Sequence, residues 1–143
     1  MTAPPAYLPP GLPPPLPDLD DLEFWEHCNR RELRIQHCTS CGHFRHTPMP
    51  TCPACRSMEF TWAEVAGTGT VFSYTIAHHA THPALRGFGP YNVVVVLLDG
   101  ADDVRMVGNV VDVAPDELHI GMKVVLHWET LDDGATLPRW RRA

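Results

Sequence analysis

Four cysteines in two closely spaced pairs are the residues whose type and spacing most clearly indicate chemistry. Cys38 and Cys41 are separated by two residues, and Cys52 and Cys55 repeat that spacing further along the chain. Cysteines at this spacing form a knuckle, and two knuckles supply the four thiolates of a tetrahedral metal site. Four thiolates leave no open coordination position, so the sequence predicts a structural centre. Zinc is favoured over iron, which takes the same ligands, because nothing nearby indicates electron transfer.

Histidines form the other candidate groups. His37, His43 and His46 flank the knuckles, and we interpret them as surface or supporting residues because four thiolates already complete the metal shell. His78, His79 and His82 follow a predicted strand and could hold a second metal or perform acid–base chemistry. On a strand, however, adjacent side chains point to opposite faces, and no glutamate lies within the cluster. We favour a role in lining a ligand or partner surface.

The overall composition narrows the class of protein. The 143 residues carry a formal charge of −6, from 17 acidic and 11 basic side chains, so the mean field repels nucleic acid. The start shows no signal peptide, and no apolar run approaches the roughly 20 residues of a membrane-spanning helix. An odd cysteine count without a secretion signal argues against a disulfide framework and favours a reducing cytoplasm.

The first part of the chain must position the knuckles. Residues 3–17 are rich in proline and favour an extended polyproline conformation, either as a disordered tail or as an arm that docks on a partner. A helix is predicted over residues 20–31, where Leu22, Trp25 and Cys28 recur at three-residue spacing. A short strand over residues 32–36 then leads into the first knuckle. Gly42 follows that knuckle, where a positive φ is often required.

Period-two patterns after the second knuckle predict a β domain. Strands are expected near Phe60, over 71–77, 91–98, 104–111 and 123–131, with a long loop over 77–90. The apolar run 91–98 is typical of a strand buried on both faces. About five strands favour a small closed antiparallel barrel such as the OB-fold, with an SH3-like barrel or a small sandwich as alternatives. In the long loop, Phe88 lies between two glycines and could be presented to a partner or an acyl chain.

Several motifs together resemble a known family. The sequence resembles the acyl-CoA-associated OB-fold family with an N-terminal rubredoxin-like zinc ribbon, over about residues 20–142. The resemblance implies a mainly β protein with an N-terminal helix, a zinc ribbon and a five-stranded OB-fold barrel. We divide the chain into a proline-rich arm (1–19), the helix and lead-in strand (20–36), the ribbon (37–60) and the OB-fold domain (61–143). The motifs are 24–26, 32–38, Cys41-Gly42, Pro50, Cys52-Pro53, Cys55, 67–75, Pro90-Tyr91, 120–124 and 137–138.

The resemblance also implies a function. Members of this family accompany thiolase-superfamily enzymes, including thiolases and retro-aldolases of steroid side-chain degradation. We therefore expect a non-catalytic subunit of a thiolase-like or aldolase-like complex that acts on acyl-CoA. The resemblance also implies a heterotetramer in the cytoplasm, with structural Zn²⁺. Two alternatives are a nucleic-acid-binding protein and an independent acyl-CoA enzyme using His78, His79 and His82. The residues that we expect on a partner or ligand surface are Phe24, Trp25, His78, Phe88 and Tyr91.

Overall fold

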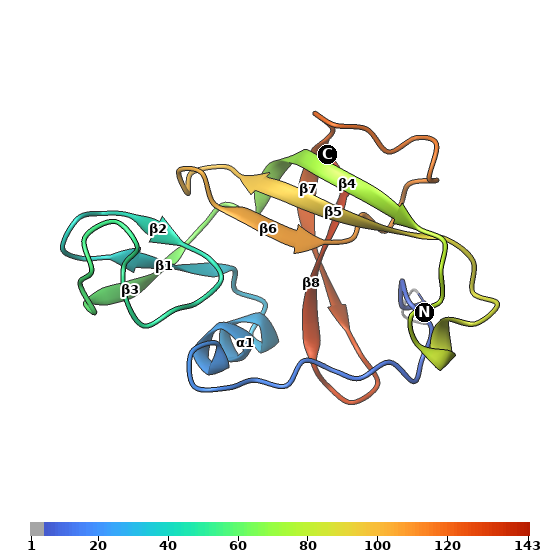
Figure 1. The fold of residues 1–143 in the computed structure, drawn as a ribbon, viewed down its shortest axis with the longest axis horizontal. Coiled ribbons are helices and arrows are strands. Elements are labelled where there is room, and N and C mark those ends of the chain that lie inside the picture. Colours follow the sequence, from blue (N-terminus) through green and yellow to red (C-terminus); the bar gives the residue numbers. More distant parts are fainter. Residues whose placement is uncertain (1–4) are drawn as a thin grey trace.

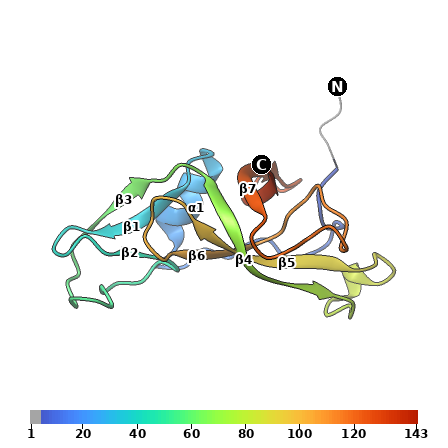
Figure 2. The same cartoon turned by 90° about the horizontal axis from the view of Figure 1, so that it is seen from above.

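The computed structural model describes residues 5–143, which form an N-terminal arm, one helix and two antiparallel sheets (Figure 1). The chain passes from the small sheet to the large one directly between β3 and β4, as the view from above also shows (Figure 2). The small sheet has the order β2-β1-β3, and the large one has the order β6-β5-β4-β7-β8 and curls into a half-barrel. The predicted fold class, mainly β with a helix, a ribbon and a five-stranded OB-fold, is confirmed. The elements are α1 (Leu22–Asn29), β1 (Arg34–Cys38), β2 (Phe44–Arg45), β3 (Phe60–Glu64), β4 (Thr68–Ala77), the 3-10 helix η1 (Pro83–Leu85), β5 (Tyr91–Leu98), β6 (Arg105–Gly108), β7 (Lys123–Thr130) and β8 (Thr136–Arg142).

Helix α1 packs against β1 of the small sheet and β8 of the large sheet. It is shorter than the sequence pattern predicts. It begins after Asp21, whose carboxylate accepts hydrogen bonds from the backbone N–H of Asp18 and the indole of Trp25. It ends before Arg31, which takes a positive φ of 60° and so stops the helical repeat. Phe24 and Cys28 are buried on its inner side. In the described part of the chain, no helix is long and apolar enough to span a membrane.

Strand β5 is buried on one face and only half-buried on the other. Asn92, Val94, Val96 and Leu98 point into the half-barrel, and the residues between them alternate outward. The prediction of a strand buried on both faces is therefore wrong. β5 is antiparallel to both its neighbours, and a curled antiparallel sheet has only one inner face. β4 crosses β5 closely at Gly69, where a Cβ atom would lie 2.5 Å from the Leu97 carbonyl oxygen.

The half-barrel is not closed by strand pairing along its full length. β6 and β8 lie at opposite ends of the strand order, and the chain after β6 meets β8 through one isolated bridge between Val110 and Trp140. The Trp140 side chain is fully buried and fills the interior at this point. The sequence pattern predicted a closed barrel, and the structure instead leaves an open side between β6 and β8 (Figure 1).

The proline-rich arm packs along this open side instead of trailing free. The hydroxyl of Tyr7 accepts hydrogen bonds from the backbone and side-chain amides of Asn92, at 3.0 and 2.8 Å. The Tyr7 backbone N–H donates to the Glu129 carboxylate at 2.8 Å. Of the two sequence-based alternatives, a disordered tail does not describe residues 5–17. Residues 1–4, which belong to the predicted arm, lie outside the described residues.

A buried polar network receives the arm. Arg139 donates two hydrogen bonds to the Glu129 carboxylate, at 3.1 and 3.3 Å, and a third to the side-chain oxygen of Asn109. Asn109 in turn donates to the backbone carbonyl of Asn92, the residue that contacts Tyr7. Because Glu129 and Arg139 pair with each other, neither buried charge carries the penalty of an isolated buried ion. The network therefore fixes the arm to the open side of the half-barrel.

The substitution Tyr7→Phe is expected to lower the free energy of unfolding by about 1 to 2 kcal/mol. It removes the acceptor of two Asn92 donors and leaves one of them buried without a partner. Urea unfolding followed by tryptophan fluorescence measures the change. Tyr91→Phe is the matched control, because no hydrogen bond to the Tyr91 hydroxyl occurs among the described residues. Equal effects of the two substitutions would show that the arm is not held through Tyr7.

Candidate metal centre

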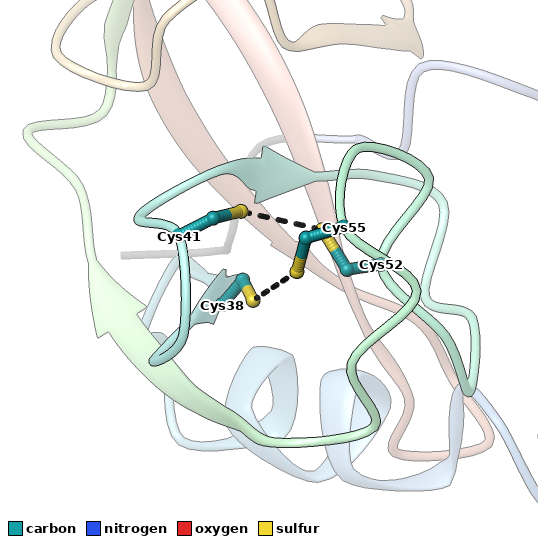
Figure 3. A group of neighbouring side chains, drawn as sticks. All are labelled: Cys38, Cys41, Cys52 and Cys55. Atoms are coloured by element: carbon teal, nitrogen blue, oxygen red, sulfur yellow. Dashed lines mark hydrogen bonds between the residues drawn. The ribbon is translucent and has the colours of Figure 1, made fainter.

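The four predicted cysteines come together at one end of the small sheet (Figure 3). Cys38 is the last residue of β1 and Cys41 follows it in a turn, while Cys52 and Cys55 lie on the loop between β2 and β3. The four sulfur atoms lie within 4.8 Å of one another. Cys38 and Cys52 are buried, and Cys41 and Cys55 are exposed, so each pair contributes one inner and one outer thiol.

The two knuckles have the same pattern of backbone hydrogen bonding. In the first, Gly42 N–H donates to the Cys38 carbonyl at 2.9 Å, and in the second Arg56 N–H donates to the Cys52 carbonyl at 2.8 Å. Gly42 and Arg56 both have a positive φ, 79° and 67°. The predicted left-handed position at Gly42 is confirmed. The equivalent position in the second knuckle could not be predicted from its residue type, because arginine rarely adopts a positive φ.

The knuckles also favour the thiolate form of their first cysteine. The backbone N–H of Cys41 is directed at the Cys38 sulfur and lowers the pKa of Cys38 to about 6. Burial raises the pKa of Cys52, but hydrogen bonds from the backbone of Cys55 and Ala54 outweigh burial and leave this pKa lowered. Thiolate is the form that binds metal, so the backbone favours the binding form of these two cysteines. A backbone hydrogen bond at His43 acts in the same direction on Cys41, but burial and the neighbouring thiols outweigh it and raise the pKa of Cys41 to about 12.

The geometry fits a tetrahedral zinc ion. Four thiolates at about 2.3 Å from zinc lie about 3.8 Å from one another. The sulfur of Cys38 lies 3.7 Å from that of Cys55, and the sulfur of Cys41 lies 3.6 Å from that of Cys52 (Figure 3). A hydrogen bond of 2.9 Å between the hydroxyls of Ser40 and Ser57 also ties the two knuckles together. The centre would hold the ribbon together and leave no position for a substrate.

The histidines are dispersed around this centre. The His37 ring packs on Phe44, with ring centroids 4.4 Å apart, and His46 packs on Phe24 at 5.2 Å. His78 and His79 are exposed, while His82 accepts a hydrogen bond from the Ala84 N–H at the start of η1. Within residues 5–143, the four cysteines form the only group of three or more His, Cys, Asp or Glu side chains arranged to hold a metal.

The residues expected on a partner or ligand surface occupy different environments. Phe24 is only 3% exposed because α1 turns it against His46, so it offers little surface, although it borders the same groove as Trp25 and Phe88. Trp25 and Tyr91 are half-buried, and His78 is exposed. Phe88 is 40% exposed and borders a groove that Trp25 also lines. The structure therefore brings Trp25 and Phe88 to one groove.

Cys55→Ser is expected to reduce bound zinc well below one equivalent, because three thiolates and a hydroxyl bind zinc much less tightly than four thiolates. Metal analysis of the purified protein measures the stoichiometry. Cys28→Ala is the matched control: Cys28 is a buried thiol on α1 outside the cluster, and burial raises its pKa to about 12. One equivalent of zinc retained by Cys55→Ser would contradict the four-thiolate centre.

Acidification is expected to destabilise the fold through His46. Burial beside Phe24 lowers the pKa of His46 to about 4, whereas the unfolded chain has an ordinary histidine pKa of about 6.5. Between these values the unfolded state binds more protons, so this part of the stability is present above about pH 6.5 and is lost toward pH 4. Unfolding of zinc-loaded protein at pH 7.5 and 5.5 should show His46→Gln losing about 1 kcal/mol less than wild type. His79→Gln, at an exposed site, should keep the wild-type pH dependence; if all three respond alike, His46 is not the cause.

Two family models match consecutive parts of the chain. The model described as the ChsH2 rubredoxin-like zinc ribbon domain matches residues 25–61, which include all four clustered cysteines. The model described as the ChsH2 C-terminal OB-fold domain matches residues 62–129. The ribbon is thus a structural zinc-binding module, and the preference for zinc over iron is confirmed.

Three curated relatives are similar in sequence. A probable enoyl-CoA hydratase alpha subunit from Thermomonospora curvata is 44% identical over 131 residues, 92% of this chain and 40% of the relative. A 3-oxo-4,17-pregnadiene-20-carboxyl-CoA hydratase alpha subunit from Mycobacterium tuberculosis is 33% identical over 84% of this chain and 39% of the relative. The chain thus spans about two fifths of these two relatives. A DUF35 domain-containing scaffold protein from Methanocaldococcus jannaschii is 30% identical over 72% of both chains.

A solved structure resembles almost the whole fold. A chain of the Ltp2-ChsH2(DUF35) aldolase superposes with a TM-score of 0.80 and 43% identity, covering 90% of this chain and 98% of that chain. The likeness includes both modules, and the sequence-based resemblance to a zinc ribbon and OB-fold family is confirmed. This chain belongs to the DUF35 family, as a ChsH2-type protein with a rubredoxin-like zinc ribbon and a C-terminal OB-fold domain.

Proposed function

We propose that this chain is a non-catalytic accessory subunit of a thiolase-superfamily complex that acts on acyl-CoA thioesters. The main support is the extent of its likeness to the ChsH2(DUF35) chain of an Ltp2-ChsH2 aldolase, which it matches over 98% of that chain's length. A relative named as a scaffold protein, about as long as this chain, also supports a role in assembly. The partner would be a thiolase-like or aldolase-like subunit, with a heterotetramer as the proposed assembly in the cytoplasm.

The chemistry of the described residues agrees with this role. Cys38, Cys41, Cys52 and Cys55 are the proposed zinc ligands, and four thiolates complete the shell without an open position. Glu129 and Arg139, which form a buried ion pair, are held in a structural network. His78, His79 and His82, the residues of the independent-enzyme alternative, form no metal-binding group among residues 5–143. The partner would therefore supply the reacting groups.

The division of the chain follows from the same proposal. We propose that the arm (1–19), the helix and lead-in strand (20–36), the ribbon (37–60) and the OB-fold domain (61–143) together serve as one docking unit. The acyl group of the substrate is proposed to be a steroid side chain, by analogy with the relative named for a pregnadiene-carboxyl-CoA. Exposed His78 and Phe88 and half-buried Trp25 and Tyr91 are the proposed partner or ligand contacts.

Co-purification tests the proposal. A tagged form of this chain, expressed in its native host and isolated gently, is expected to retain a thiolase-superfamily protein in near-equal amount, identified by mass spectrometry. That enzyme, produced without this chain, should be less stable and at least tenfold less active on acyl-CoA. The isolated chain should turn over no acyl-CoA thioester. The proposal fails if the enzyme is equally stable and active without this chain.

A further inference from the structure

Strand β6 leaves one side of its backbone unpaired. It is the end strand of the five-stranded sheet, with β5 on its only paired side. Leu98 N–H donates to the Val104 carbonyl at 3.0 Å, so the backbone of Val104 faces β5. In an antiparallel pair, successive residues direct their N–H and C=O groups alternately toward and away from the partner strand. Arg105 and Val107 therefore point their backbone groups outward, where no strand among residues 5–143 receives them.

This free edge borders a groove on the open side of the half-barrel. Four consecutive residues, Arg105 to Gly108, line the groove, although the Met106 side chain is buried in the core. Such a run is expected where the backbone edge of a strand, and not one of its faces, forms a wall. The arm, α1 and the β7–β8 hairpin form the other walls, below β6 in Figure 1. Val107, 66% exposed, and Phe88, 40% exposed, give the groove apolar surface.

The arm also lines the groove but does not pair with the edge: no hydrogen bond joins the described arm residues to β6. Most of the arm residues at the groove are prolines, including Pro9, Pro10, Pro13, Pro14 and Pro15. Proline has no backbone N–H and therefore cannot donate to a neighbouring strand. A proline-rich cover protects an edge from uncontrolled aggregation while leaving its hydrogen-bonding groups available. The edge is thus open to a chain that carries its own N–H groups.

The groove has an acidic rim, and this charge favours one kind of occupant. The rim consists of the acidic residues that line the groove and form no ion pair among the described residues: Asp18, Asp20, Asp21, Asp132 and Asp133. The phosphates of a CoA ester would be repelled by an acidic rim, and so would a second copy of this chain, because the same acidic rim would meet itself. A segment with lysine or arginine beside an apolar stretch would be attracted. The Arg105 guanidinium, which stacks over the Phe72 ring at 4.1 Å, also lines the groove, but its single positive charge offsets only one of the five carboxylates.

We propose that the outer edge of β6 is the docking site for an extended, apolar segment of the partner subunit, flanked by lysine or arginine. The segment would add a strand beside Arg105 and Val107, with main-chain hydrogen bonds supplying affinity and the apolar groove and acidic rim supplying specificity. This inference rests on the proposed function, because it assigns the surface through which the accessory subunit holds its enzyme.

A peptide of alternating valine and threonine with two lysines at each end is the probe. NMR titration of the full chain should shift the backbone amides of Arg105 and Val107 first. A peptide with glutamates in place of the lysines should bind at least tenfold more weakly. A Lys-flanked peptide methylated on every backbone nitrogen of its valine–threonine stretch should also lose at least tenfold, because neither of its edges can donate to β6. Equal binding of all three peptides, or no shift at β6 up to millimolar peptide, would overturn the proposal.

Substitution of the edge itself provides the second arm of the test. Val107→Pro removes an outward N–H without breaking a hydrogen bond to β5 and should weaken the peptide at least tenfold. Val107→Thr, which keeps the N–H and the β-branched shape, is the matched control and should bind within about twofold of wild type. Both should keep one equivalent of zinc and the wild-type amide spectrum away from β6. If Val107→Pro misfolds, the comparison of methylated and unmethylated peptides on wild-type protein still decides the question.

Co-purification separates this inference from the proposed function. If Val107→Thr retains the thiolase-superfamily enzyme and Val107→Pro loses it, the edge is the docking site. If both variants retain the enzyme equally, the accessory role stands and the docking site lies elsewhere. If neither variant nor wild type retains an enzyme, the proposed function itself fails.

Discussion

The convergence of four thiolates on one zinc ion is the interaction on which the ribbon depends. The small sheet has strands of five, two and five residues, too few to bury a stable core of their own. Metal binding therefore supplies folding free energy that the apolar side chains cannot. A ribbon fixed in this way holds β1 and β3 in register, and β1 presents Ile35 to the common core beneath α1.

The open side of the half-barrel is stabilised by polar contacts where strand pairing stops. Asn92 lies on β5, Asn109 directly after β6, Glu129 on β7 and Arg139 on β8. Tyr7 joins these four residues from the arm. Each charge in this network has a partner, which a buried ion pair needs if it is not to destabilise the fold. The arrangement leaves β6 as a free edge, and it is this incomplete closure that gives the molecule a groove.

Local sequence determined the metal centre, the helix and the order of the modules. The spacing of Cys38, Cys41, Cys52 and Cys55 is a short-range property, since each knuckle closes within five residues and needs no distant contact to be read. The period-two pattern after residue 60 likewise reflects which side chains alternate between core and solvent. The apolar run of β5 predicted burial on both faces, but residue type alone does not reveal that the outer face of this strand is only half-buried.

Only the tertiary structure decided how the distant parts meet. Nothing local to Tyr7 predicts a hydrogen bond to Asn92, 85 residues away, and nothing local to Phe24 distinguishes a surface aromatic from one buried against His46. The free edge of β6 exists because β8 lies at the other end of the strand order, which is a property of topology and not of either strand's sequence. The sequence by itself thus determined the ligands and the elements, because their signals are short-range. The groove, the docked arm and the acidic rim required the fold, because they are made of residues that only long-range packing brings together.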